Sequence, residues 1–274
     1  MTGQTDSLID TEVISRMRRF FVETFNLSGS TAHISGLDAR HIKTVLRLKP
    51  GDEIELFDGT GVVYSARITS FLPKQVKVDL LGKSPLTTES PIHITVAQAY
   101  LKDSKMDILI RQLTELGIVA WLPFISERSV PKPDNKRLEG RRQRWQKIAQ
   151  ESLKQCRRGR VPQIGQMETF RAVLETAQTS DLKIIFWESE NRPLHSLVEP
   201  PQPDRIVRRI FLILGPEGGF AIQEVQQAVA CGFQSISLGP RILKAETATV
   251  SACALIQYLF GDLGQKHLDK EKGF

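Results

Sequence analysis

A glycine-rich segment in the last third of the chain carries the residues best suited to binding a ligand. The apolar run Ile210–Leu214 leads directly into Gly215, Pro216, Glu217, Gly218 and Gly219. Ligands bind at the C-terminal ends of strands in α/β sheets, and glycines there let the backbone approach them. The segment lacks both G-x-x-x-x-G-K-[ST] and G-x-G-x-x-G, and the carboxylate of Glu217 would repel a phosphate. We therefore expect a neutral or cationic ligand such as a sulfonium, although a plain strand-to-helix turn would also explain the glycines.

A second loop of the same kind follows one strand later. It consists of Leu238, Gly239, Pro240, Arg241, Ile242 and Leu243, and a helix begins near Lys244. Glu246 and Thr247 fall in the first turn of that helix, where the helix dipole favours a carboxylate. Capping of the helix would account for both residues. Two such loops on successive strands, each with its own glutamate, nevertheless indicate one shared ligand cleft.

The middle of the chain concentrates positive charge. Residues 136–160 contain ten Lys and Arg against two Glu, a local charge of +8, whereas the whole chain carries +6. Arg157, Arg158 and Arg160 crowd the end of a helix there, and three arginines within four residues exceed what the helix dipole needs. We expect this segment to contact RNA phosphates. The alternative is a solvated basic helix face.

Strands that alternate with helices must position these loops. Five strand candidates follow residue 91: Ile92–Ala99, Val119–Ile125, Lys183–Trp187, Ile210–Leu214 and Ser235–Leu238. Their alternation with helical stretches predicts an α/β domain with a mostly parallel sheet. The best-marked helices run from Ser104 to Gly117 and from Lys244 to Phe260. Ser104 and Asp107 resemble the start of a capping box.

The N-terminal part has a different pattern. Residues 17–83 show short alternating strands broken by turns, with one short helix near 38–46, which predicts a small barrel-like domain. The polar segment 84–91 contains prolines and is expected to be a linker. We further expect an irregular extension over 1–16, the α/β domain over 92–264 and a tail over 265–274.

The composition excludes several classes of protein. No window reaches the roughly 18 unbroken apolar residues of a membrane span, and the N-terminus lacks a secretory signal. The three cysteines, Cys156, Cys231 and Cys253, are odd in number and widely spaced. A disulfide framework and a cysteine-rich metal site are therefore disfavoured. We expect a cytoplasmic protein with no bound metal and no membrane partner.

Together the motifs resemble one family. They are GPEGGF, LGPRILKAETA, Thr114–Gly117, Ser126–Ser129, the Arg-Val-Pro near 160, Arg18–Phe21, His41 and Val45–Asp52. This combination, which spans about residues 17–264, resembles the bacterial 16S ribosomal RNA uridine N3-methyltransferases of the SPOUT class. The resemblance implies a PUA-like RNA-binding barrel, followed by an α/β domain whose last segments form a trefoil knot. It also implies a homodimer through the knot, and uridine 1498 of 16S rRNA in the small subunit as target.

The resemblance assigns roles to individual residues as well. S-adenosylmethionine would be bound by Leu214, Gly215, Pro216, Glu217, Gly218, Gly219, Leu238, Gly239, Arg241, Ile242, Leu243 and Thr247. RNA would be bound by Arg18, Arg19, His41, Arg47, Lys102, Arg128, Arg157, Arg158 and Arg160. Two positions depart from the family pattern. Gln112 stands where a lysine is common, and Arg157 stands where a glycine is common, so the turn at Arg157 is in question.

Chemistry limits the catalytic roles. Uridine N3 must lose its proton before it attacks a methyl group, and the resulting anion needs stabilisation at O2 and O4. Arginine stays protonated and is not a base. We therefore expect Arg158 or Arg241 to stabilise the anion, and Glu217 or Glu246 to accept the proton.

Other functions remain open at this point. A SPOUT enzyme that acts on transfer RNA or on another ribosomal site would share these motifs. A non-catalytic RNA-binding assembly factor would keep the fold without the chemistry. The missing phosphate-loop lysine motif disfavours an NTP-binding protein.

Overall fold

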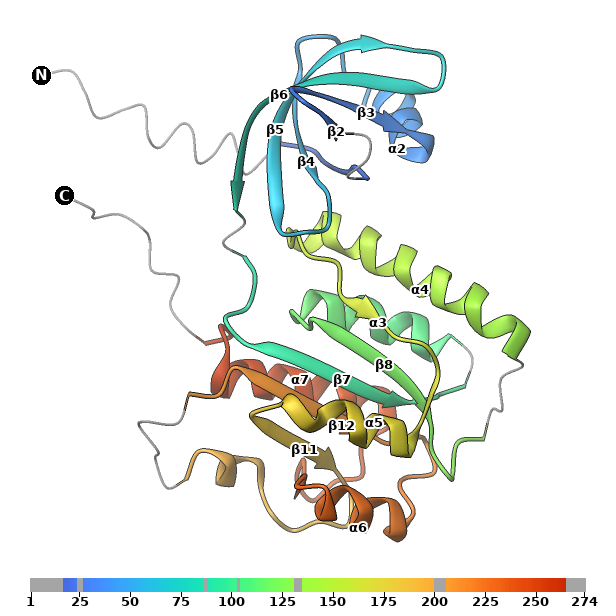
Figure 1. Cartoon of the computed structure of the whole chain (residues 1–274), viewed down its shortest axis with the longest axis vertical. Coiled ribbons are helices and arrows are strands. Elements are labelled where there is room, and N and C mark those ends of the chain that lie inside the picture. The colour runs from blue at the N-terminus through green and yellow to red at the C-terminus, as the bar shows by residue number, and fades with distance from the viewer. Residues whose placement is uncertain are drawn as a thin grey trace, which may run out of the picture. The chain divides into compact units, whose positions relative to one another are not determined.

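The computed structural model describes residues 17–23, 27–85, 88–102, 104–130, 135–199 and 206–264. The expected extension 1–16 and tail 265–274 lie outside the described residues. The chain divides into two compact units (Figure 1). The N-terminal unit comprises Met1–Glu89 and Leu153–Val161, and the C-terminal unit comprises Ser90–Ser152 and Pro162–Phe274. The domain limits deduced from the sequence stay a prediction, to which the structure adds that Leu153–Val161 returns to the N-terminal unit.

The N-terminal unit is a six-stranded sheet with one short helical segment. Its strands are β1 (Arg19–Phe21), β2 (Leu27–Ser28), β3 (Thr31–Ser35), β4 (Glu53–Phe57), β5 (Val62–Phe71) and β6 (Gln75–Pro85), in the order β1-β4-β5-β6-β3-β2. Within the described part of this sheet, only the pairing of β1 with β4 is parallel. Ile54 and Leu56 alternate with more exposed residues along β4 and point into the core. The predicted short helix is α2 (Gly36–Arg40), continued by the π-helical turn η2 (His41–Val45).

The C-terminal unit is built on a seven-stranded sheet. Its strands are β7 (His93–Ala99), β8 (Ala120–Ile125), β9 (Gln163–Ile164), β10 (Glu168–Thr169), β11 (Leu182–Phe186), β12 (Arg209–Leu214) and β13 (Gln234–Ile236), in the order β10-β8-β7-β12-β11-β13, with β9 beside β8. All of these pairings are parallel. The predicted parallel sheet is confirmed, and all five strand candidates lie within two residues of the observed strands. The trefoil knot stays a prediction.

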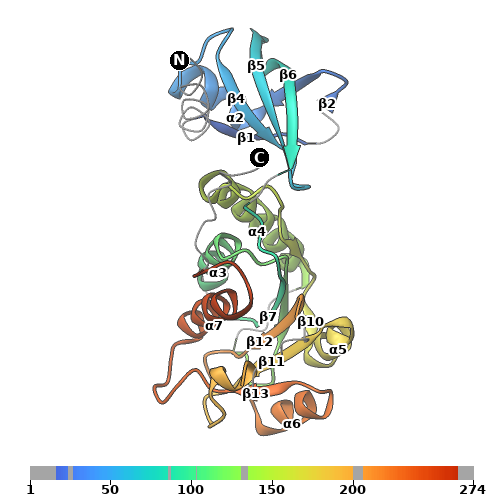
Figure 2. The ribbon, with the colours of Figure 1, turned by 90° about the vertical axis from the view of Figure 1, so that its left-hand side faces the viewer.

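Helices cover both faces of this sheet. They are α3 (Lys105–Glu115), α4 (Asn135–Cys156), α5 (Phe170–Thr176), α6 (Ile222–Ala230) and α7 (Ala245–Phe260). α3 and α7 pack together on one face, and α5 and α6 lie on the other (Figure 2). Among the described residues, no helix is long and apolar enough to cross a membrane.

One helix start differs from the sequence expectation. Ser104 precedes α3 but makes no side-chain capping hydrogen bond. The carboxylate of Asp107 instead accepts hydrogen bonds from Nε of Arg144 at 2.8 Å and from the indole N–H of Trp145 at 3.0 Å. The expected capping box at Ser104 is therefore wrong, because Asp107 tethers α3 to α4.

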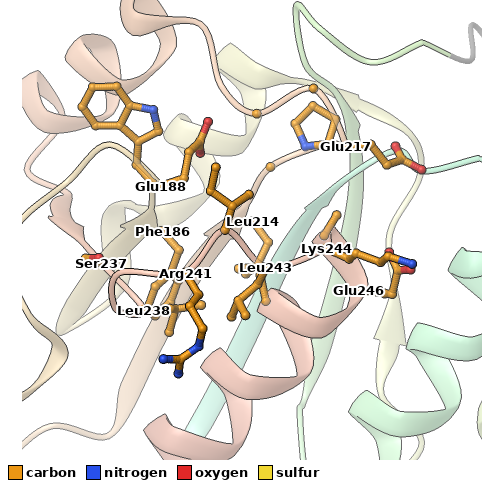
Figure 3. Close-up of a pocket in the computed structure, with 18 of the residues that line it drawn as sticks. Phe186, Glu188, Leu214, Glu217, Ser237, Leu238, Arg241, Leu243, Lys244 and Glu246 are labelled. Atoms are coloured by element: carbon orange, nitrogen blue, oxygen red, sulfur yellow. The ribbon is translucent and has the colours of Figure 1, made fainter.

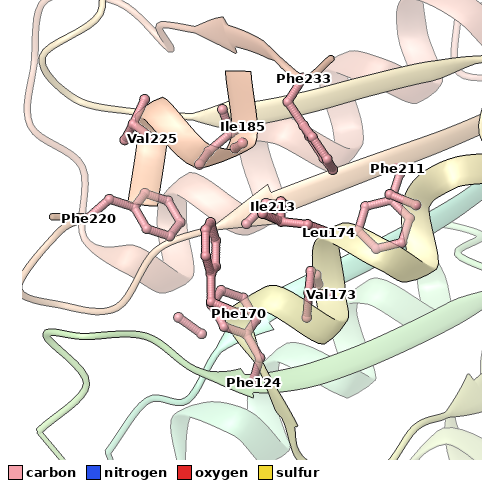
Figure 4. Packing of buried hydrophobic residues seen from close by; sticks show 14 residues of the cluster. Phe124, Phe170, Val173, Leu174, Ile185, Phe211, Ile213, Phe220, Val225 and Phe233 are labelled. Carbon is pink, nitrogen blue, oxygen red and sulfur yellow. The ribbon is translucent and has the colours of Figure 1, made fainter. Parts of the chain in front are cut away.

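An aromatic core holds the sheet against α5 and α6. Its largest members are Phe124, Phe170, Phe211, Phe220 and Phe233, all buried (Figure 4). Phe220 follows the glycine-rich loop directly and packs against Phe170, with ring centroids 6.1 Å apart. Burial of a side chain of this size contributes about 2 kcal/mol, so it fixes the end of the loop firmly.

The parallel arrangement brings three strand ends to one edge of the sheet. Ile185 on β11 pairs with Ile213 on β12, and Phe186 pairs with Ile236 on β13. The segments that follow these strands therefore begin side by side. They are Trp187–Glu188, the glycine-rich loop and the Leu238–Leu243 loop.

Candidate active site

A cavity of about 570 Å³ lies at the C-terminal ends of β11, β12 and β13 (Figure 3). Both predicted loops line it. Every residue expected to bind the cofactor contributes to the lining except Thr247, which is exposed on α7. The shared cleft inferred from the two loops is thus present in the structure.

Two glycines let the first loop close in on its neighbours. A Cβ on Gly218 would lie 3.3 Å from Cβ and from the carbonyl oxygen of Arg128. Gly219 has φ +68°, and a Cβ there would meet Oε1 of Glu188 at 2.2 Å. Side chains at these two positions would therefore displace the cavity wall.

Further residues line the cavity that sequence reasoning did not identify. They are Lys105, Phe186, Trp187, Glu188, Ser237, Lys244, Ala245 and Ala248. Phe186–Glu188 end a strand, as the two predicted loops do, so adjacency of parallel strands was the available signal. Nothing near Lys105 in the sequence links it to either loop.

Charge in the cavity is balanced. Its lining contains the cations Lys105, Arg241 and Lys244 and the anions Glu188, Glu217 and Glu246. A site for a polyphosphate would be expected to show an excess of cations. Balanced charge, two aromatic side chains and an accessible backbone suit an adenosine-type ligand that carries an ammonium, a carboxylate and a sulfonium. The residues present therefore fit S-adenosylmethionine.

The two predicted carboxylates share one lysine. Nζ of Lys105 lies 3.2 Å from Oε1 of Glu217 and 3.3 Å from Oε2 of Glu246. The backbone N–H of Lys102 also donates to Oε1 of Glu217, at 3.2 Å. Figure 3 shows Glu217 and Glu246 at one end of the cavity and Glu188 at the other.

These contacts shift the protonation of both partners. Partial burial alone would raise the pKa of Glu217, but hydrogen bonds from its own backbone and from Lys102 and Lys105 lower it below its ordinary value. Desolvation opposes charge on Lys105, yet its bonds to Glu217 and Glu246 raise the pKa of that ammonium. An ion pair of this kind favours a carboxylate that stays ionised, which makes Glu217 a weak proton acceptor.

A buried carboxylate, that of Glu224, places Arg128 against the glycine-rich loop. Glu224 accepts hydrogen bonds from the hydroxyl of Ser126 and the N–H groups of Glu127 and Ala221, each at 3.0 Å. It therefore joins the Ser126–Ser129 segment to the start of α6. Arg128 then lies over the glycine-rich loop, with Nη1 3.4 Å from the carbonyl oxygen of Gly218.

Arg158 belongs to the N-terminal unit and is 3% exposed. Its Nη2 and Nε donate to Oε2 of Glu89 at 2.9 and 3.1 Å, and the N–H groups of Gly159 and Arg160 donate to Oε1. Burial alone would raise the pKa of Glu89, but its bonds to Arg158 and the two backbone groups lower it. The guanidinium is thus engaged within its own unit, which favours Arg241 for stabilising a substrate anion.

Arg157 adopts a left-handed backbone conformation, which glycine adopts more readily than arginine. Its φ is +63°, and its N–H donates to the carbonyl of Leu153 at the end of α4. Arg47, after η2, has φ +54°. These are the only described non-glycine residues with positive φ. The chain therefore ends α4 with a left-handed turn at Arg157, a conformation that strains a residue with a side chain.

The remaining residues predicted to bind RNA differ in exposure. Arg18, His41, Arg47, Lys102, Arg128, Arg157 and Arg160 are exposed. Arg19 is not, since Nε lies 3.2 Å from Glu55 and the guanidinium lies over the ring of Phe57. Desolvation lowers the pKa of Arg19 despite Glu55, and this packing favours a structural role for it.

A metal site is not evident in the part of the chain that the structure describes. No group of three or more His, Cys, Asp or Glu there could hold a metal ion. Cys156, Cys231 and Cys253 form no disulfide among the described residues.

Comparisons with known proteins identify the family to which the chain belongs. Residues 88–257 match the family model of the RNA methyltransferase domain, and residues 34–81 match that of the RNA methyltransferase PUA domain. Ribosomal RNA small subunit methyltransferase E of Buchnera aphidicola from Acyrthosiphon pisum is 33% identical over 229 residues, 84% of this chain and 88% of that protein. The protein of that name from Synechocystis is 32% identical over 266 residues, 94% of this chain and 85% of that protein.

Two solved structures have the same fold. One is ribosomal RNA small subunit methyltransferase E from Neisseria gonorrhoeae bound to S-adenosylmethionine, with TM-score 0.79, 34% identity and coverage of 90% of this chain and 99% of that one. The other is a Legionella pneumophila methyltransferase with bound S-adenosylmethionine, with TM-score 0.80, 30% identity and the same coverage. The chain belongs to the family of ribosomal RNA small subunit methyltransferase E, a SPOUT-type α/β fold preceded by a PUA-like domain.

Proposed function

We propose that this chain transfers a methyl group from S-adenosylmethionine to N3 of a uridine in 16S ribosomal RNA, the family target being uridine 1498. The observation that carries the proposal is the single cavity at three parallel strand ends, lined by both glycine-bearing loops. Its balanced charge and close backbone approach suit the cofactor, which supplies the methyl group.

Orientation and electrostatics supply most of the chemistry available to the residues of this site. The two loops would hold S-adenosylmethionine, and the transfer of its methyl group depends on the orientation that they impose. Arg241, an exposed side chain of the cavity lining, stabilises the uridine anion at O2 and O4. Glu217 is disfavoured as proton acceptor, because its lowered pKa makes it a weak base, and Glu246 stays the other candidate for that role.

The chain binds RNA mainly through contacts to the phosphate groups. The exposed arginines and the basic residues of α4 carry this role, and aromatic residues make up only 7% of the chain, too few for a broad base-stacking surface. Affinity should therefore fall steeply as salt rises. An RNA titration without salt dependence would contradict this mode of binding.

The chain acts as a cytoplasmic homodimer in this proposal. Apolar side chains stay exposed on and after α7, including Leu255, Tyr258 and Leu263. Ile242, on the second loop of the cavity, is 88% exposed. A second copy that covers these side chains would remove them from water.

One experiment tests the function directly. Unmodified small ribosomal subunits are incubated with the protein and methyl-labelled S-adenosylmethionine, and the modified nucleotide is mapped. Label at N3 of uridine 1498 is the expected result. Label in transfer RNA or at another ribosomal site would identify a different SPOUT substrate, and cofactor binding by calorimetry without transfer to any RNA would identify a non-catalytic assembly factor.

A further inference from the structure

Lys105 occupies a position that the local rules of helix formation disfavour. It is the first residue of α3. The N-terminus of a helix carries partial positive charge, so a lysine there is repelled by the helix dipole. A residue that breaks a local rule without a structural gain nearby indicates a role elsewhere.

The compensating contacts of Lys105 come from two distant segments. Glu217 belongs to the glycine-rich loop, and Glu246 belongs to the first turn of α7. Nζ of Lys105 lies 3.2 and 3.3 Å from their carboxylate oxygens, and all three residues line the cavity. One ammonium thus bridges the glycine-rich loop and the start of α7, the helix that directly follows the second loop.

On the buried side of the cavity wall, the neutral side chain of Gln98 links the same two segments. The buried amide of Gln98, on β7, donates to the carbonyl oxygen of Gly215 at 3.3 Å and accepts from the hydroxyl of Thr249 at 2.6 Å. Gln98 therefore links the glycine-rich loop to α7 in the interior of the unit. Lys105 makes the corresponding link at the cavity itself, where side chains are partly exposed.

We propose that Lys105 is a positioning residue which sets the separation between the glycine-rich loop and the start of α7, the helix that follows the second cofactor loop, by pairing with Glu217 and Glu246 together. The inference rests on the proposed function only in taking S-adenosylmethionine as the ligand. The two carboxylates compensate the positive charge of the Lys105 ammonium. Lys105 therefore fixes the position of the cavity wall and does not stabilise a substrate anion. Glu217 and Glu246 accordingly act as its partners.

The test measures cofactor affinity by calorimetry in the full-length chain. Lys105→Met should weaken S-adenosylmethionine about tenfold, as expected for a partly exposed bridging pair, and Lys105→Arg should restore part of that loss. Glu246→Gln should weaken binding in the wild type but add little to Lys105→Met, because both changes break the same contact. Lys74→Met, which removes an exposed lysine between β5 and β6 of the N-terminal unit, is the matched control and should bind normally.

A second measurement does not depend on the ligand. Amide hydrogen exchange of the ligand-free protein should be faster over 214–219 and over 238–246 in Lys105→Met than in Lys74→Met. Unchanged exchange, or additive effects of Lys105→Met and Glu246→Gln, would overturn the proposal, as would a lower melting temperature with unchanged affinity. If the wild type itself fails to bind S-adenosylmethionine, the proposed function fails while the exchange result still decides the role of Lys105.

Discussion

The cavity wall and the arginine-rich segment both gather charge, but the structure uses that charge differently. At the cavity, Lys105 pairs with two carboxylates that are about a quarter exposed. In the N-terminal unit, Arg158 is buried against Glu89, which also accepts two backbone N–H groups. A cluster of cations in a sequence therefore does not tell which of them is free to meet a ligand, because burial and pairing decide that.

Removal of the buried ion pair between Arg158 and Glu89 should have the largest effect on stability. Arg158→Ala leaves the carboxylate of Glu89 without its guanidinium, and loss of one partner of such a pair costs about 3 kcal/mol of stability. Urea denaturation measures this change. Arg160→Ala, on an exposed neighbour, is the control, and equal stability of both variants would show that the Glu89 pair contributes little.

The same pair predicts a pH dependence of stability. The pKa of Glu89 is lowered in the folded chain, so its contribution is present above the ordinary pKa of a glutamate, about 4.3, and is lost as pH falls through the folded value. In the Arg158→Ala variant, the free energy of unfolding should therefore fall less steeply as the pH is lowered through this range. If the pH dependence of the unfolding free energy is the same in the variant, other carboxylates cause the loss of stability in acid.

A smaller effect is expected at the cavity wall. Gly219→Ala places a Cβ against Glu188 and requires positive φ from alanine, which costs about 1 kcal/mol. Weaker binding of S-adenosylmethionine should accompany the loss of stability. Calorimetry of the single variant and of Gly219→Ala with Glu188→Ala separates the two causes, since the second change removes only the collision.

Arg157→Gly should act in the opposite direction. Glycine relieves the left-handed strain at φ +63° and should stabilise the chain by up to about 1 kcal/mol. If Arg157 contacts a phosphate, the slope of log affinity for RNA against log salt should also fall by about one. A stabilised variant with an unchanged slope would remove Arg157 from the RNA-binding set.

The smallest effect is expected at a fully solvated pair. Arg171 and Glu175 lie one turn apart on α5 and form an ion pair at 3.1 Å, with both side chains largely exposed. Pairs of this kind contribute little. Arg171→Ala should leave the midpoint of urea denaturation unchanged within error. A clear shift would mean that the exposure of an ion pair does not predict its contribution to stability.

Much of the fold and half of the site could be predicted from local patterns. Apolar strands followed by Gly-Pro loops identify β12 and β13, because parallel strand ends share one edge. The partners Glu89 for Arg158, and Glu217 and Glu246 for Lys105, could not be predicted, since each contact joins residues 69 or more positions apart. Asp107 was misjudged for the same reason, because its partners lie on another helix.

The strand order of the C-terminal sheet has a consequence for synthesis of the chain. β12 lies between β7 and β11, although it leaves the ribosome after both. Until residue 214 has emerged, β7 and β11 each present an unpaired edge to other nascent chains. We therefore expect this unit to depend on chaperone protection late in translation, and premature termination before β12 to yield aggregating fragments rather than a smaller working enzyme.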